Sequence, residues 1–352
     1  MRLLILTQAV DRNDPVLGFF HEWIKEFSRH TDEVIVGCLR VGEYELPQNV
    51  RVVSLGKERG VSRMGIVRNF YRLIVREQKH YDAVFVHMNP EYVVLGGIPW
   101  RLLRKRIVLW YTHKHVDLKL RVAEKFAHAV LTASDESLRL STRKKYVMGH
   151  GINTEFFSPT SVAPPSAPFE IVTVGRISPA KDLETLIASV EMLVGDDLDV
   201  HTTIVGGAGT TDQERYERMI KERAAPLVAQ GRLRFAGPVP HHQTLGTLQN
   251  AQVFVSMSKT GSLDKVILEA MAVGVPVVSC NDAAGAIFRD DHPGLIFAPG
   301  DARGLAEALT SVIRMSASER RALGAHLRQI VVEHHTLSPL IMRIIHHLSL
   351  PL

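Results

Sequence analysis

The sequence predicts an α/β protein of two doubly wound domains, each with a parallel sheet between layers of helices. With 352 residues, the chain is too long for one ordinary domain and fits two. In each half, short apolar runs alternate with helical patterns, which is typical of parallel strands joined by crossover helices. Residues 158–168, SPTSVAPPSAP, are rich in Pro, Ser and Ala and form the best linker. Two such domains are expected to face each other across a ligand cleft at the carboxyl ends of their sheets.

The first half supplies seven expected strands and five expected helices. The strands are expected at 3–6, 33–38, 50–53, 83–87, 107–111, 129–131 and 145–148. The helices are expected at 18–28, 65–78, 92–104, 118–127 and 134–141. The first apolar run has one basic residue before it and acidic Asp11 and Asp14 after it. We therefore interpret it as a buried strand and not as a signal peptide.

The second half repeats the alternation from residue 169 onward. Strands are expected at 170–174, 200–205, 233–236, 253–256, 276–279 and, more briefly, 295–297. Helices are expected at 182–193, 211–229, 242–249, 265–272, 303–315, 318–333 and 338–348. These elements divide the chain into an N-terminal domain (1–158), a linker (159–168), a C-terminal domain (169–335) and a last helix (336–352) that could pack back on the first domain.

Composition points to a soluble cytoplasmic protein. The hydrophobic share is 45% and the charged share 22%, as in ordinary globular proteins. No apolar run approaches the ~18 residues that cross a membrane. The two cysteines, Cys38 and Cys280, lie far apart in apolar strand patterns, so neither a disulfide framework nor a zinc site is expected. The sixteen histidines other than His113 lack metal-ligand spacing with carboxylates, and no metal is predicted.

Positive charge is concentrated in the first half. Residues 1–155 hold 25 Lys and Arg against 17 Asp and Glu, while the remainder holds 17 against 20. The excess includes the cluster Arg101, Arg104, Lys105, Arg106, Lys114, Lys119, Arg121 and Lys125. Such a surface could make a peripheral contact with the anionic inner face of a membrane, or could simply be a solvated basic face. No nucleic-acid-binding motif accompanies it, so nucleic acid is not an expected partner.

The segment Gly175–Asp182, GRISPAKD, follows the apolar run 171–174. The glycine ends the strand, and Arg176 and Lys181 come from the loop and the start of the next helix. Arginine offers a planar fork of donors and lysine a point charge, a pair that suits a diphosphate. Alone, an Arg and a Lys five residues apart are more often solvated surface.

The segment 261–276, GSLDKVILEAMAVGVP, combines a carboxylate, a small-residue helix and a buried strand. We expect Glu269 near the first turn of its helix, beside free backbone N–H groups. Its carboxylate can accept from two vicinal hydroxyls while the N–H groups face an anion. The plain alternative is that Glu269 is only a favourable charge near a helix N-terminus.

Taken together, these segments resemble the retaining glycosyltransferases of family 4 (glycosyl transferases group 1), which have the GT-B fold of two Rossmann-like domains. The resemblance spans most of the chain, and its specificity comes from the order of the motifs. They are His150-Gly151-Ile152-Asn153 with Phe156-Phe157-Ser158-Pro159, Val174-Gly175-Arg176 with Lys181, Ile204-Val205-Gly206 with Gly209, Phe235-Ala236-Gly237-Pro238-Val239, and Leu268-Glu269-Ala270-Met271-Ala272 with Gly274 and Pro276-Val277-Val278.

The resemblance implies a role for each matching residue. Arg176 and Lys181 hold the donor diphosphate, and Glu269 binds the ribose. Val239 borders the nucleobase, and His113, after the expected strand 107–111, contacts the donor sugar. The N-terminal domain binds the acceptor and the C-terminal domain the nucleotide sugar. No cofactor is implied beyond the donor substrate.

Two departures from the family pattern matter. The family often has a glutamate that faces the sugar where this chain has Gly261, so the sugar hydroxyls are expected to meet the backbone of Ser262, Leu263 and Asp264, or the Asp264 carboxylate. The alternative for Asp264 is that it only caps the helix carrying Glu269. The family also often has a glycine pair after the first strand, where this chain has only Gly18. In the family the backbone of this glycine pair lies near the donor phosphates, and the backbone at Gly18 could do the same. The alternative is that Gly18 simply starts a helix.

The predicted activity is a hexosyltransferase-type retaining transfer from a nucleotide-diphosphate sugar to an acceptor hydroxyl of a glycan, a lipid-linked saccharide or a small molecule. The rivals are a GT-B sugar-nucleotide epimerase and an inactive sugar-nucleotide-binding protein. A nicotinamide-dependent dehydrogenase is a further rival, but it needs a stronger glycine fingerprint at the first strand. The loop 206–209, GGAG, is instead interpreted as a tight turn after a strand, because it follows the second strand of its domain.

Overall fold

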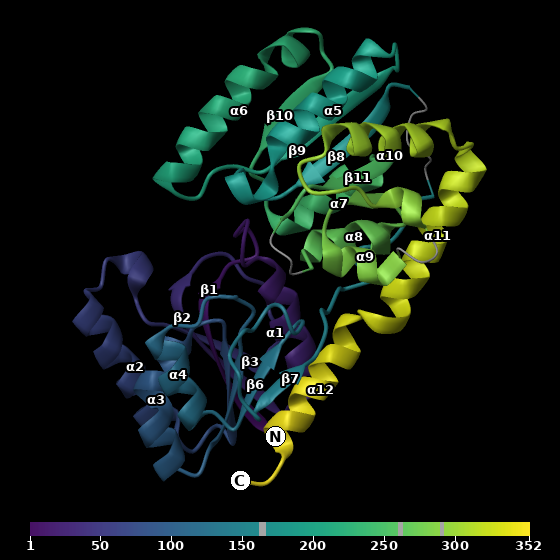
Figure 1. Ribbon diagram of the computed structural model, residues 1–352. Coiled ribbons are helices and arrows are strands. Elements are labelled where there is room, and N and C mark those ends of the chain that lie inside the picture. Colours follow the sequence, from purple (N-terminus) through teal and green to yellow (C-terminus); the bar gives the residue numbers. More distant parts are fainter. Residues whose placement is uncertain (162–166, 260–262, 289–291) are drawn as a thin grey trace. The chain divides into compact units, whose positions relative to one another are not determined.

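The structure is a computed structural model that describes residues 1–161, 167–259, 263–288 and 292–352. The chain forms two compact units (Figure 1). The first comprises Met1–Gly151, Pro240–His242 and Leu337–Leu352, and the second comprises Ile152–Val239 and Gln243–Thr336. The boundary thus falls at Ile152, before the linker expected at 159–168, of which 162–166 lie outside the described residues. The last helix is part of the first unit.

The first unit contains a seven-stranded parallel sheet. Its strands are β1 (Arg2–Val10), β2 (Glu33–Val41), β3 (Val50–Ser54), β4 (Ala83–His87), β5 (Arg106–Trp110), β6 (Ala129–Thr132) and β7 (Lys145–Val147). They lie in the order β3-β2-β1-β4-β5-β6-β7. The order reverses between β1 and β4, so the loops that follow these two strands diverge and leave room for a ligand at the carboxyl ends of the strands.

Helices cover both faces of this sheet. They are α1 (Phe19–Arg29), the short η1 (Lys57–Arg59), α2 (Arg63–Glu77), α3 (Pro90–Leu102), α4 (Leu118–Phe126) and α12 (Leu337–Ser349). Alternate residues of β1 sort them into layers, because successive side chains of a strand point to opposite faces. Leu3 and Ile5 pack with α1 and α12. Leu4 and Leu6 pack with α2, α3 and α4.

The second unit contains a five-stranded parallel sheet in the order β10-β9-β8-β11-β12. Its strands are β8 (Phe169–Val174), β9 (Val200–Val205), β10 (Leu233–Gly237), β11 (Val253–Ser256) and β12 (Val277–Ser279). Its helices are η2 (Pro179–Lys181), α5 (Leu183–Gly195), α6 (Thr211–Ala229), α7 (Thr244–Gln249), α8 (Lys265–Val273), α9 (Asp282–Phe288), η4 (Pro293–Leu295), α10 (Ala302–Arg314) and α11 (Ala317–His334). The turn η3 (His241–Gln243) precedes α7.

The predicted fold class of two parallel-sheet α/β domains is confirmed, but three elements differ from the prediction. The helix expected at 134–141 is absent, and bends and turns stand in its place. Ser134 there accepts a hydrogen bond from the backbone of Ser137, the kind of local bond that competes with a helix. The strand expected at 295–297 reduces to one bridge between Ile296 and Ser279. Helix α9 was not predicted, and Gly285 within it weakens the helical signal.

Within the part of the chain that the structure describes, no helix is both long and apolar enough to cross a membrane.

Candidate functional site

The strongest candidate site lies at one edge of the second sheet, where the strand order reverses between β8 and β11. Loops that follow neighbouring parallel strands on either side of such a reversal diverge and leave room for a ligand. Arg176 and Lys181 follow β8, and Lys259 and Asp264 follow β11. Residues far apart in the sequence therefore meet at this edge.

Glycines let the strand ends approach closely here. The Gly175 N–H donates to the Val205 carbonyl at 2.9 Å, and the Gly206 N–H donates to the Gly237 carbonyl at 2.9 Å. Gly206 has φ of +139°, and a Cβ on it would stand 1.8 Å from the Gly175 carbonyl oxygen. No other residue fits there. The loop 206–209 thus serves a close backbone contact directly after β9.

Lys181 and Asp264 form the central ion pair of the site. The Lys181 Nζ lies 2.6 Å from the Asp264 Oδ2, and their side chains are 23% and 20% exposed. The lysine side chain runs past Gly175, where an added Cβ would stand 3.3 Å from the Lys181 Cε. Asp264 occupies the N-cap position of α8, but its side chain makes no capping hydrogen bond. The structure therefore does not support the alternative in which Asp264 only caps the helix.

A second pair beside it joins Lys259 to Asp182. The Lys259 Nζ lies 2.7 Å from the Asp182 Oδ2, and this hydrogen bond raises the pKa of Lys259. Asp182 is buried, and it also accepts a hydrogen bond from the Thr185 hydroxyl at 2.8 Å. Lys259 was not among the predicted site residues, although it follows an apolar strand run just as Arg176 does. Its position directly after a strand run is the sequence signal that could have identified it as a site residue.

Arg176 is exposed and, in the part of the chain described, makes no ion pair. A Cβ on Gly209 would stand 3.9 Å from its Cδ, so the arginine passes beside the glycine loop after β9. The site thus gathers the cations Arg176, Lys181 and Lys259 at one sheet edge. An anion with two phosphates suits such a group, because each cation can donate several hydrogen bonds.

Glu269 is buried, but it lies in the second turn of α8 and not near the first turn, where it was expected. Helix α8 begins four residues earlier, at Lys265, because Lys265-Val-Ile-Leu continue the helical pattern after the extended Asp264. The unbonded N–H groups at the helix N-terminus therefore lie a turn before Glu269. Lys265 is only partly exposed, and burial lowers its pKa to about 7, although the Glu269 charge acts in the opposite direction.

The remaining predicted donor residues of this unit are distributed as follows. Leu263 is buried in the core of the unit. Val239 is half-buried and lies two residues beyond β10. Gly261 and Ser262 lie outside the described residues.

Two predicted site residues belong to the first unit. Gly18 is in the helical region and stands tightly packed, since an added Cβ would lie 2.6 Å from the Asp14 carbonyl oxygen. The Val16 and Leu17 N–H groups both donate to the Asp14 Oδ1 at 2.8 Å, so these donors already have a partner. His113 is exposed in the loop after β5, with its ring 5.7 Å from that of Tyr111.

Comparison with known proteins defines the class first. Residues 156–329 match the family model of the Glycosyl transferases group 1. Nearly all of the matched residues lie in the second unit, and they include the loops after β8 and β11 that form the site described above.

Individual relatives agree with this class. WcaL of Escherichia coli K12, named as a colanic acid biosynthesis glycosyltransferase, is 25% identical over 82% of this chain and 64% of its own. The lipopolysaccharide core biosynthesis glycosyltransferase LpsE of Rhizobium meliloti is 35% identical over 43% of this chain and 41% of its own. The chain thus spans about two-thirds or less of these curated relatives.

Solved structures establish the fold along nearly the whole chain. HepE of Anabaena, solved in complex with UDP-glucose, matches with a TM-score of 0.76 and 19% identity over 99% of both chains. Sucrose-phosphate synthase from Thermosynechococcus elongatus matches with a TM-score of 0.74 and 17% identity over 98% of both chains. The fold is therefore the GT-B fold that the sequence predicts.

Proposed function

We propose that the protein is a family 4 retaining glycosyltransferase that moves a sugar from a nucleotide-diphosphate sugar to an acceptor hydroxyl. The observation that carries the proposal is the gathering of Arg176, Lys181 and Lys259 at the β8/β11 edge, inside a glycosyl transferases group 1 domain. The names of the relatives, and the UDP-glucose bound to HepE, support a nucleotide-sugar donor.

In this proposal the cations act on the leaving diphosphate. Negative charge grows on the diphosphate as the bond to the sugar breaks, so fixed positive groups stabilise the transition state more than the ground state. Lys181 is held by Asp264 at 2.6 Å and must turn from it, or share it, to reach a phosphate. Arg176, whose side chain passes beside Gly209, contacts the same diphosphate.

The other predicted residues bind the remaining parts of the donor. Glu269 accepts from the ribose hydroxyls, Val239 borders the base, and His113 orients the sugar. The backbone of 261–263 or the Asp264 carboxylate meets the sugar hydroxyls in place of the family's glutamate, and the backbone near Gly18 borders the phosphates. The second unit is the donor domain, and the first is the acceptor domain. The acceptor hydroxyl attacks from the face that the diphosphate leaves, and the leaving phosphate takes the hydroxyl proton. Attack from this face retains the anomeric configuration.

The proposed setting is the cytoplasm, with peripheral contact at the inner face of an anionic membrane and a role in polysaccharide or glycoconjugate synthesis. The relatives named for colanic acid and lipopolysaccharide core synthesis support this setting. We propose no obligatory metal, because two or three protein cations supply positive charge at the diphosphate.

The first experiment is a thermal-shift screen across UDP-, GDP-, ADP- and dTDP-sugars, since binding stabilises the folded state by mass action. The stabilising donor is then incubated with candidate acceptors, and product anomers are assigned by NMR. Retained configuration, with activity that survives EDTA, supports the proposal. Inverted product, or donor epimerised without acceptor, contradicts it. Binding without turnover across broad acceptors indicates an inactive binding protein.

A further inference from the structure

Most of the positive charge of the first unit lies in the stretch of chain that carries one layer of its helices. Residues 63–126 hold 13 Lys and Arg against 5 Asp and Glu, a net charge of +8. Residues 1–62 hold 8 against 9 and contribute none of the excess. The basic stretch contains α2, α3 and α4, which cover the same face of the sheet (Figure 1).

The outer surface of this layer is apolar as well as basic. Helix α2 buries Phe70, Leu73 and Ile74 against the sheet, as a surface helix should. Its opposite face carries Met64, Tyr71 and Val75, spaced seven and four residues apart, with exposed fractions of 86%, 39% and 64%. A helix that faces water normally carries polar residues on this side.

The other two helices of the layer repeat the pattern. Ile98 and Leu102, one turn apart on α3, are 60% and 79% exposed, and Leu118 at the start of α4 is 75% exposed. Basic residues accompany them on the same elements, at Arg101 on α3 and Arg121 on α4. We call this surface of α2, α3 and α4 the basic apolar face.

A row of arginines borders the apolar stripe of α2. Arg68, Arg72 and Arg76 follow one another at four-residue spacing, so they lie along one side of the helix. Among the described residues, neither Arg68 nor Arg72 forms an ion pair with a carboxylate. Helix α6 provides a contrast, because its four Lys and Arg are balanced by four Asp and Glu.

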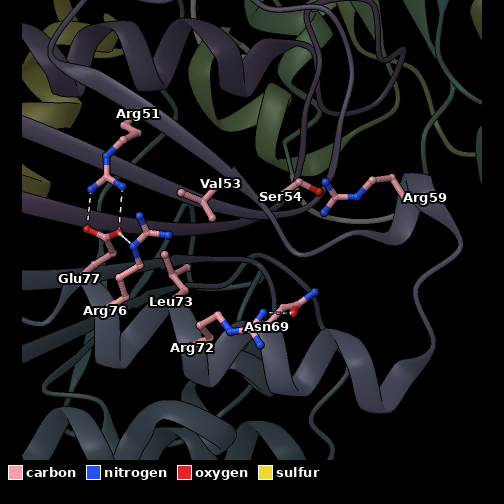
Figure 2. Close-up of a pocket in the computed structure, with 9 residues that line it drawn as sticks. All are labelled: Arg51, Val53, Ser54, Arg59, Asn69, Arg72, Leu73, Arg76 and Glu77. Atoms are coloured by element: carbon pink, nitrogen blue, oxygen red, sulfur yellow. Dashed lines mark hydrogen bonds and ion pairs between the residues drawn. The ribbon is translucent and has the colours of Figure 1, made fainter.

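The arginine row leads into a groove between α2 and β3. The groove has a volume of about 300 Å³ and is lined by the guanidinium groups of Arg51, Arg59, Arg72 and Arg76, with Ser54 and Asn69 (Figure 2). Glu77 is the acidic residue among its lining side chains. Arg51 donates to both Glu77 oxygens, at 2.9 and 2.5 Å, and this pairing lowers the pKa of Glu77. The ionised Glu77 fixes Arg51 in place, and the lining keeps a surplus of positive charge.

We propose that the basic apolar face docks on an anionic lipid bilayer and that the arginine groove holds a headgroup phosphate. Met64, Val75 and Leu102 enter the boundary between headgroups and acyl chains, while the arginines remain at the level of the phosphates. Guanidinium suits this place because it binds phosphate through two parallel hydrogen bonds. A bilayer suits these residues because lipid accommodates scattered apolar side chains, whereas a protein partner would need a surface of complementary shape.

The basic apolar face lies on the first unit alone, and its role rests on the peripheral membrane contact proposed above and not on sugar transfer. It names the surface that meets the membrane and adds a phosphate site remote in the sequence from every predicted donor residue. Each basic side chain near an anionic lipid surface increases the partitioning of the protein onto the membrane about fivefold, and this attraction weakens as the salt concentration rises.

The test is flotation of the full chain with vesicles of phosphatidylcholine alone or mixed with phosphatidylglycerol. We expect binding to the anionic vesicles only, weakened on the order of 20-fold in Arg68→Ala/Arg72→Ala. Met64→Ser/Val75→Ser should weaken it about threefold to tenfold, by loss of apolar burial. The matched control is Arg215→Ala/Arg218→Ala on α6, beside the exposed Met219, and it should bind as the unchanged protein does.

Several results would overturn the proposal. Equal binding to neutral vesicles would show that charge does not drive the binding. Unchanged binding in both α2 variants would show that the basic apolar face is not the surface that binds the membrane. Saturable binding of soluble glycerol phosphate without vesicle binding indicates a free-anion site, and tight RNA binding without vesicle binding indicates a nucleic-acid surface. Calorimetry of donor binding in the same variants separates this question from the proposed function, because donor affinity should be unchanged whichever way the vesicles decide.

Discussion

Replacing Asp264 with asparagine should strengthen the binding of a bare nucleoside diphosphate. In the ligand-free structure the Lys181 Nζ lies 2.6 Å from the Asp264 Oδ2, so the carboxylate competes with a phosphate for this lysine. Asparagine keeps the size of the side chain and removes its charge. The variant therefore tests competition without leaving a cavity.

The magnitude follows from the exposure of the pair. Both side chains are about one-fifth exposed, so the interaction is stronger than that of a surface pair, which contributes about 0–1 kcal/mol, yet weaker than that of a fully buried one. The negative carboxylate also repels an incoming diphosphate. Together these effects predict a gain of about 1 kcal/mol, or roughly fivefold in affinity.

The assay is titration calorimetry with both the nucleoside diphosphate and the intact sugar nucleotide. If Asp264 also binds sugar hydroxyls, the variant gains affinity for the first ligand and loses part or all of the gain for the second. The control is Lys181→Ala with and without Asp264→Asn. Without the lysine, the asparagine can no longer improve binding by freeing Lys181 for the phosphate. Weaker binding of the bare diphosphate in Asp264→Asn would refute the competition and favour a role of the ion pair in shaping the site.

Three further predictions concern the same edge of the sheet. Glu269→Ala should weaken nucleoside diphosphate binding by about 1–3 kcal/mol, and Glu269→Gln by less, because the charged hydrogen bonds proposed between Glu269 and the ribose would be lost. Unchanged affinity by calorimetry would exclude the ribose role. Arg176→Ala and Lys181→Ala should each lower turnover more than stability, with non-additive effects because both are proposed to act on one diphosphate. A double variant with near-normal turnover would exclude this site. The pKa of Lys265 is lowered to about 7, so between pH 7 and about 10 the unfolded chain binds more protons and stability should rise with pH. Lys265→Met should therefore stabilise the protein by about 1–3 kcal/mol at pH 6 and by little near pH 10, and a gain that does not depend on pH in urea unfolding would contradict the buried charge.

The strands were predictable because their sequence and their environment agree. A parallel strand is buried on both faces, so runs such as 83–86 and 253–255 are continuously apolar and bounded by polar residues. The helix wrongly expected at 134–141 has the opposite character. Its serines form local hydrogen bonds, and whether such residues continue a helix or fold into turns depends on tertiary context.

The candidate site was predictable only in part. Arg176 and Lys181 stand beside a strand-ending glycine, which is a local signal. The partner of Lys181 is 83 residues away, at Asp264, and only the adjacency of β8 and β11 brings the two together. The pairing of Lys259 with Asp182 depends on the same adjacency. Sequence patterns identify the loops that follow strands, but the order of the strands decides which loops meet.

That dependence explains how this chain can depart from the family pattern at 261–265 and still keep a charged site. The resemblance expects a glutamate at 261, whereas the chain has Gly261 there and an aspartate at 264. A carboxylate at 264 stands at the N-terminus of α8, where the helix dipole favours negative charge, and it lies within reach of Lys181. The acidic group is thus moved from the start of the loop to its end, and there it meets the lysine proposed to bind the diphosphate. A substitution that moves a charge in this way changes which part of the donor the charge can contact, so separate affinities for nucleoside diphosphate and sugar nucleotide are the measurement that this site requires.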